Sequence, residues 1–168
     1  ADWYIPRLEV YQQDPVFYHD QVKDGCELWV YSCCFPEEHW WLNKFVDQPH
    51  VYSRLIKYAC FSQNITGFLH WGFNSYKADM YGLHTAARFK GDGHIIYPDD
   101  INNNVLMSVR GLETKAGLQD WELLIMLKKI NPKAARDISS SVAKSFSDFS
   151  HDAKAPERAR ETILSLLD

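Results

Sequence analysis

Three side chains that could bind a saccharide lie at the ends of two predicted strands. Tyr31 and Trp71 are near the carboxyl ends of aromatic-rich strands, and Asn74 follows the second strand closely. An indole can stack on the apolar face of a sugar ring, and a phenol or an amide can hydrogen-bond a hydroxyl or acetamide group. Trp3, which ends an earlier strand, is a fourth candidate. The competing interpretation is structural, with aromatic rings that fill a core and an asparagine that forms a turn.

The other reactive side chains show no arrangement typical of catalysis or metal binding. The seven histidines lack HExxH or comparable ligand spacing, so the sequence predicts no metal site and no cofactor. Glu37 and Glu38 form a carboxylate pair near the strand ends, but neighbours on an irregular loop need not converge on one bond. Gly91-Asp92-Gly93 lacks the strand, helix and further glycines of a dinucleotide site and is predicted to be a turn. No residue is therefore assigned a catalytic role.

The composition is that of a globular protein and argues against two classes of partner. With a net charge of -4 and no basic stripe, the 168 residues predict no nucleic-acid binding. No run approaches the roughly 18 apolar residues of a membrane span, so no membrane contact is predicted. Aromatic residues make up 14% of the chain, which favours a surface groove lined by some of them.

Two predicted strands and the helix between them position the candidate residues. Residues 26–34 have apolar side chains on both faces, as in a parallel sheet covered by helices, and residues 67–74 form the second strand. Residues 51–63 have helical spacing. Such a βαβ unit predicts parallel strands whose carboxyl ends meet at one edge of a sheet. The irregular segment 36–50 follows the first strand at that edge, where binding loops are common.

A long helical pattern is predicted later in the chain. It includes Leu106, and Gly117 is expected to break or kink it near the middle. Arg110, Asp120 and Glu122 along this pattern are predicted to form a buried or half-buried set of ion pairs that ties the helix to the sheet.

The chain ends in two further predicted helices. They begin at Pro132 and Pro156, since proline is favoured in the first turn of a helix. We therefore divide the chain into a sheet-containing segment, residues 1–100, and a helical segment, residues 101–168, packed on it as one structural unit.

Several short motifs follow one another along the chain in a specific order. They are Leu28-Trp29-x-Tyr31-x-Cys33-x-x-Pro36, Gly67-x-Leu69-x-Trp71-x-x-Asn74, Gly91-Asp92-Gly93-x-Ile95-x-Tyr97-Pro98, Ser108-x-Arg110-x-Leu112-Glu113 and Gly117-Leu118-x-Asp120-Trp121-Glu122. Together they resemble the carboxyl-terminal part of glycoside hydrolase family 123 and a related family of unknown function. Three departures bear on fine specificity more than on the fold: Lys115-Ala116-Gly117 replaces the usual Arg-Asp-Gly, Trp121 replaces a tyrosine, and Tyr58 stands where the family tends to have a tryptophan.

The resemblance implies the activity of a β-N-acetylgalactosaminidase with a retaining, substrate-assisted mechanism. In that mechanism the 2-acetamido oxygen of the substrate attacks the anomeric carbon, so the protein supplies no nucleophile. The family's catalytic carboxylates are an adjacent Asp-Glu pair, and this sequence contains no Asp-Glu dipeptide. We therefore expect the chain to contribute the wall of an N-acetylhexosamine pocket without hydrolysing glycosides alone. The alternative is a non-catalytic carbohydrate-binding or structural domain.

The resemblance also implies a fold of the α/β class. It would be the carboxyl-terminal portion of a (β/α)8 barrel, with two to three parallel strands, crossover helices and a helical tail. Because residues 2–6 look like the end of a strand, the chain has the appearance of a fragment. A piece of barrel leaves sheet edges and apolar surface uncovered. The expected partners are thus an N-acetylhexosamine glycan and either the missing amino-terminal part of the barrel or a second copy.

Overall fold

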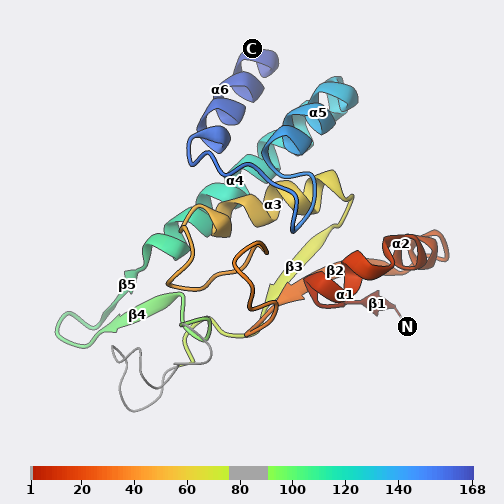
Figure 1. Ribbon diagram of the computed structural model, residues 1–168. Coiled ribbons are helices and arrows are strands. Elements are labelled where there is room, and N and C mark those ends of the chain that lie inside the picture. The colour runs from red at the N-terminus through yellow and green to blue at the C-terminus, as the bar shows by residue number, and fades with distance from the viewer. Residues whose placement is uncertain (1, 76–90) are drawn as a thin grey trace.

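The computed structural model describes residues 2–75 and 91–168 and contains a sheet of three parallel strands (Figure 1). The strand order is β1-β2-β3, so β2 pairs with both neighbours. A separate antiparallel pair, β4-β5, forms a hairpin. The α/β class is as predicted. Along the described residues the elements are β1 (Trp3–Tyr4), α1 (Leu8–Gln13), α2 (Pro15–Lys23), β2 (Glu27–Ser32), α3 (Tyr52–Ser62), β3 (Gly67–His70), β4 (Ile96–Asp99), β5 (Asn104–Met107), α4 (Val109–Ile130), α5 (Pro132–Val142) and α6 (Ala155–Leu167).

The two faces of β2 differ in how well they are covered. Leu28, Val30 and Ser32 are buried on the face that packs against the helices. Trp29 and Tyr31, on the other face, remain partly exposed. The prediction that helices cover both faces is therefore wrong for the described part of the chain. Apolar side chains on both faces indicate that both are to be covered, but they do not specify what covers them.

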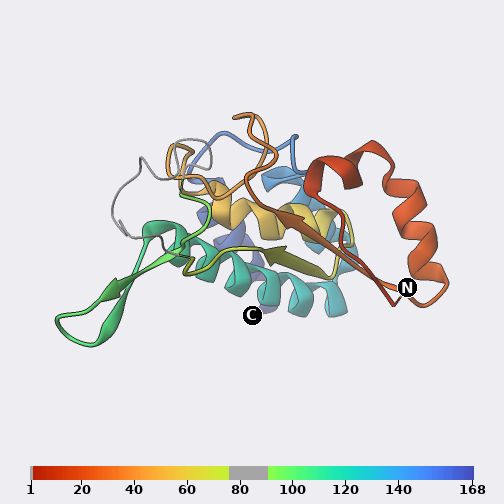
Figure 2. The same cartoon turned by 90° about the horizontal axis from the view of Figure 1, so that it is seen from below.

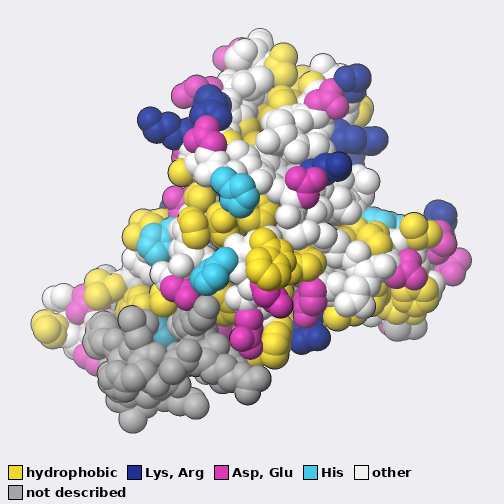
Figure 3. Space-filling view, viewed as in Figure 1, with side chains coloured by type: hydrophobic (Ala, Val, Ile, Leu, Met, Phe, Trp, Pro, Cys, Tyr) yellow, Lys and Arg dark blue, Asp and Glu magenta, His cyan; other side chains and the backbone are white. Residues whose placement is uncertain are grey.

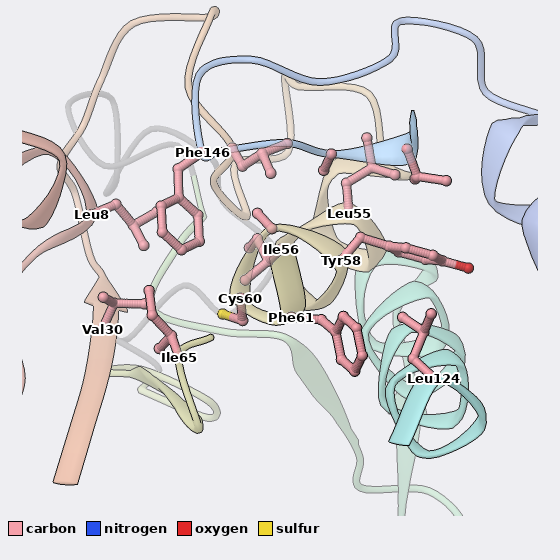
Figure 4. Close-up of a cluster of buried hydrophobic side chains, with 14 of the residues drawn as sticks. Leu8, Val30, Leu55, Ile56, Tyr58, Cys60, Phe61, Ile65, Leu124 and Phe146 are labelled. Carbon is pink, nitrogen blue, oxygen red and sulfur yellow. The ribbon is translucent and has the colours of Figure 1, made fainter. Parts of the chain in front are cut away.

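The hydrophobic core is centred on α3. Nine of the eleven residues of this helix are buried, and they pack against α4, α5 and the sheet. Figure 4 shows the α3 side chains in the middle of the cluster, with side chains from α1, β2 and α4 around them. Each fully buried large apolar side chain contributes roughly 1.5–3 kcal/mol to folding. The core therefore connects the sheet to the C-terminal helices.

Residues 104–107 form strand β5, so the prediction that Leu106 belongs to the long helix is wrong. Leu106 pairs with Tyr97 of β4 in the hairpin. The helix α4 begins only after Ser108, whose side chain accepts a hydrogen bond from the backbone at the helix start. It then continues through Gly117 without the predicted break. Over only four residues, apolar spacing does not distinguish a strand from the first turn of a helix.

A buried carboxylate, Asp120 of α4, joins three helices. Its Oδ2 accepts a hydrogen bond from Arg54 Nε of α3, and its Oδ1 accepts one from Arg160 Nε of α6, both at 2.6 Å. The predicted ion-pair set of Arg110, Asp120 and Glu122 is therefore wrong in its partners. Glu122 is exposed, and Arg110 donates to backbone carbonyl groups instead. Partners from α3 and α6 are distant in sequence, which is why local pattern did not reveal them.

The hairpin and the N-terminal helices lie at opposite ends of the molecule. Figures 1 and 2 both show β4-β5 projecting from one end and α1-α2 lying at the other. The helices α5 and α6 extend away from the sheet, and most of the Lys and Arg side chains visible in Figure 3 lie over them. Among the helices of the described ranges, none has the length and apolar character needed to cross a bilayer.

We predict that Gly117→Ala lowers the free energy of unfolding by about 1–3 kcal/mol, because overpacking a tight contact is destabilising. A Cβ at this position would lie 2.8 Å from the backbone oxygen of Arg54 and 3.1 Å from its Cα. At an open helix position a glycine-to-alanine change would raise the free energy of unfolding by about 1 kcal/mol. The sign of the change in this free energy therefore shows whether the contact at Gly117 is tight. Urea denaturation measures it. Lys115→Ala, at an exposed position of α4, is the control, and unchanged stability of Gly117→Ala would contradict such close helix packing.

Candidate functional site

Tyr31 and Trp71 lie at the same edge of the sheet. In the parallel register Ser32 pairs with His70, so Tyr31 immediately precedes and Trp71 immediately follows this pair. Tyr31 is partly exposed, and Trp71 is 51% exposed. Burial raises the pKa of Tyr31, so its phenol is protonated at neutral pH and can donate a hydrogen bond. Phe73, 55% exposed, adds a second aromatic side chain beyond the end of β3.

A buried carboxylate holds the indole of Trp71. Trp71 Nε1 donates a hydrogen bond to Asp92 Oδ2 at 2.6 Å. The Asp92 side chain is fully buried, and among the described residues its Oδ1 has no hydrogen-bond partner. Burial raises the pKa of Asp92, while the hydrogen bond from Trp71 and the charge of Arg110 oppose that shift. The carboxylate thereby restricts the orientation of an indole that is half exposed to solvent.

The turn that carries Asp92 packs closely beneath Trp71 because two of its neighbours are glycines. A Cβ on Gly93 would lie 3.2 Å from the Trp71 ring, and one on Gly72 would lie 2.6 Å from Gly93 Cα. Gly91 has a φ of +75°, which glycine adopts without strain. The sequence correctly predicts a turn at Gly91-Asp92-Gly93, but it gave no role to Asp92. The signal that could have found it is a carboxylate enclosed by glycines in an apolar segment.

Arg110 connects this turn to the loop that follows β2. Its guanidinium donates to the carbonyl oxygens of Gly91 and His94, each at 2.8 Å, and also to that of Lys44. Within the same loop, the Asn43 amide donates to the backbone oxygen of Cys33 at 3.0 Å. The segments next to Tyr31 and Trp71 are therefore held together through buried hydrogen bonds.

We call the edge of the sheet at the carboxyl ends of β2 and β3, where Tyr31 and Trp71 lie, the rim. His70 lies next to the rim, on the buried face of β3. Its Nε2 is 2.6 Å from the carbonyl oxygen of Asp92, and its Nδ1 is 3.2 Å from Ser32 Oγ. Burial lowers the pKa of His70 to about 4, with a further contribution from the charge of Lys44. A neutral imidazole has one N–H, so both nitrogens are satisfied when Nε2–H donates to Asp92 and the Ser32 hydroxyl donates to Nδ1. His70 therefore fixes the Asp92 turn to the sheet.

The structure does not bring all four predicted site residues together. Trp3 pairs with Glu27 and packs edge-on against Trp29, with ring centres 4.8 Å apart. Glu27 is four residues before Tyr31, so Trp3 lies about 13 Å from the rim along the strand direction. Asn74 is exposed at the rim side, where its backbone forms a bridge with His94. Trp71, Tyr31 and Asn74 thus share one edge, and Trp3 lies toward the other end of the sheet.

The side chains at this edge can stack on the ring of a ligand and hydrogen-bond its polar groups. It offers an exposed indole of fixed orientation, a protonated phenol and an amide. In the parts of the chain that the structure describes, no three His, Cys, Asp or Glu side chains gather where they could hold a metal ion. Glu38, from the predicted carboxylate pair, is exposed on the loop after β2.

Comparison with protein families shows which family this chain belongs to. The model of the glycoside hydrolase 123 catalytic domain matches residues 2–127. The chain belongs to this family. A search of curated proteins found no match.

A solved family 123 glycoside hydrolase from Clostridium perfringens has a similar fold. Its structural analysis concerns the hydrolysis of glycolipid glycans. The TM-score is 0.66 at 15% sequence identity, and the match covers 99% of this chain and 33% of that chain. At this identity the likeness concerns the fold alone. The present chain thus spans about a third of the length of that family 123 structure.

We predict that His70 makes stability depend on pH in the acidic range. Its pKa is lowered from 6.5 to about 4 in the folded state, so its contribution is complete above pH 6.5 and is lost as the pH falls toward 4. The full loss would be about 3 kcal/mol. Urea denaturation between these pH values should show a shallower pH dependence for His70→Asn than for the natural protein. His50→Asn, at an exposed position, should retain the natural dependence, and equal slopes for all three proteins would contradict the burial of a neutral His70.

Proposed function

We propose that this family 123 chain forms part of the wall of a pocket for an N-acetylhexosamine. The observation that supports this most directly is the half-exposed Trp71, whose indole N–H is held by the buried carboxylate of Asp92. A ring of fixed orientation loses little conformational freedom when a sugar stacks on it. Tyr31 then hydrogen-bonds a hydroxyl group or the acetamide, and Asn74 reaches the sugar from the segment beyond β3.

We further propose that the three-stranded sheet is an arc of a (β/α)8 barrel. The uncovered face of β2, with Trp29 and Tyr31, would then face the interior of the barrel, and β1 and β3 would pair with further strands at their outer edges. The rim would lie at the carboxyl end of the strands, where barrel enzymes bind substrate. Residues 1–100 would supply the arc, with residues 101–168 packed on it. The further strands would come from another part of the protein or from a second copy.

The proposed reaction of the whole protein is hydrolysis of a β-N-acetylgalactosaminide with substrate assistance. The 2-acetamido oxygen would attack the anomeric carbon as the bond from that carbon to the leaving oxygen breaks, which exploits the fixed geometry of an intramolecular step. A general acid outside this chain would protonate the leaving oxygen, and water would then open the oxazolinium intermediate. Stacking on Trp71 would hold the sugar ring, and a hydrogen bond from Tyr31 would help to place the acetamide. We assign no acid or base to this chain, because the sequence contains no Asp-Glu pair. The absence of this pair also favours a second candidate function, that of a carbohydrate-binding domain without catalysis.

We predict that Trp71→Ala weakens the binding of N-acetylgalactosamine about tenfold, because it removes the stacking surface. Asp92→Asn should weaken binding about threefold, because it replaces the charge-assisted hydrogen bond to the indole with a neutral one. Titration calorimetry with each variant measures both effects. Trp3→Ala is the matched control, since Trp3 is 49% exposed but lies away from the rim. Equal affinity of Trp71→Ala and the natural protein would remove Trp71 from the site.

We predict that the chain by itself binds the sugar without turning over an aryl N-acetyl-β-galactosaminide. Catalysis would need the adjacent Asp-Glu pair that this sequence does not contain. Release of the aryl alcohol is followed by absorbance, and galactose serves as the calorimetric control for recognition of the acetamido group. Turnover by the purified chain that Asp92→Asn abolishes would instead place the acid within this segment.

A further inference from the structure

A cavity lies on the buried face of β3, which carries Phe68 and His70. In the sheet register, Phe68 and His70 align with the buried residues Val30 and Ser32. Between these side chains and α4 there is a cavity of about 250 Å³. Its walls are largely apolar and include Phe68, Phe73, Ile95 and Leu118.

Two lysines bring positive charge to this cavity, and none of the described residues that line it carries a carboxylate. Lys44, from the loop after β2, is 4% exposed, and its Nζ donates to Thr114 Oγ1 at 2.5 Å. The Thr114 hydroxyl itself donates to the backbone oxygen of Arg110, so its lone pairs are left for Lys44. Lys57 of α3 also lines the cavity. An ammonium group has three donors, and among the described residues only Thr114 accepts from Lys44, which leaves two donors for a ligand.

Among the described residues, no carboxylate acts as a counter-ion to Lys44. Burial, together with the smaller effects of the charges of Lys57 and Arg110, lowers the pKa of Lys44 to about 7. Cys60 acts in the opposite direction, but burial raises the pKa of its thiol, so it is neutral at pH 7. His70 on β3 is also neutral, with a pKa of about 4. A buried ammonium that faces only cations and neutral groups among the described residues either loses its proton, as the lowered pKa of Lys44 reflects, or is stabilised by an anion that joins it.

We propose that this cavity binds a small monocarboxylate with an apolar body. The carboxylate would accept hydrogen bonds from Lys44 and be attracted by Lys57, and the body would contact the apolar walls around Phe68. Phosphate fits less well, because none of the described residues that line the cavity is an arginine, whose guanidinium would bind it through two hydrogen bonds. At about 250 Å³ the cavity suits a ligand slightly smaller than those in typical pockets of about 300–1,000 Å³. The proposal does not depend on the sugar-binding function.

Benzoate is the probe, and benzamide is its uncharged counterpart of the same shape. In titration calorimetry, benzoate should bind at least about tenfold more tightly than benzamide, since the charge interaction is with a buried ammonium. Lys44→Met removes the charge and keeps an apolar stem, so it should abolish this preference. Lys115→Met, at an exposed position of α4, is the matched control and should bind benzoate as the natural protein does.

The protonation of Lys44 supplies a second, independent readout. Benzoate should raise the pKa of Lys44 by about one unit or more, seen as a shift of its side-chain resonances in an NMR titration. Affinity should also fall about tenfold between about pH 6 and pH 8, as Lys44 loses its proton. Equal binding of benzoate and benzamide, or an unchanged Lys44 pKa, would overturn the proposal. Self-association that Lys44→Met abolishes would overturn it too, because an acidic side chain of a second copy would then occupy the cavity.

Discussion

The helix α3 lies against α4 at Gly117, where the backbone of Arg54 occupies the space that a larger side chain would need. The side chain of Arg54 then reaches Asp120, which also binds Arg160 of α6. Three helices therefore converge on one buried carboxylate. Because α3 also packs on the sheet, this contact sets the position of β2 and β3 relative to the C-terminal helices. Removing Asp120 would leave the buried guanidinium of Arg54 with only the half-exposed Glu157 as an ion-pair partner among the described residues, and a desolvated charge paired so weakly is costly.

The rim depends on this framework through backbone contacts more than through side chains of the core. Arg110 of α4 donates to the carbonyl groups of Gly91 and His94, so the position of α4 determines where the Asp92 turn lies. Asp92 in turn restricts Trp71. An exposed aromatic ring usually samples several rotamers. Here a chain of buried hydrogen bonds from a long helix orients the ring, which agrees with a surface that must recognise one face of a ligand.

Local pattern was sufficient for β2 and α3, because their apolar runs and their boundaries are encoded within a few residues. It also placed the start of β3, but the strand ends at His70 and not at residue 74 as predicted. It was also sufficient to place Tyr31 and Trp71 at one edge, since parallel strands joined by a helix share their carboxyl ends. Asp92 could not be found in this way, because its importance comes from a hydrogen bond to a residue 21 positions away. The prediction for Leu106 was wrong for another reason. Strand β5 is exposed and has only four residues, so it is too short for its periodicity to identify it as a strand.

The alternation of side chains along β3 separates two chemically different environments. Leu69 points to the uncovered face, with Trp71 at its end, whereas Phe68 and His70 point toward the helices and the cavity of Lys44. His70 touches both environments, because its Nε2 contacts the Asp92 turn while its ring lines the cavity. A change of charge at Lys44 would therefore act on the same imidazole that fixes the turn beneath Trp71. The charge of Lys44 lowers the pKa of His70. An anion beside Lys44 would oppose that effect and favour protonation of His70. Binding of an anion in the cavity would therefore change the electrostatics next to the Asp92 turn.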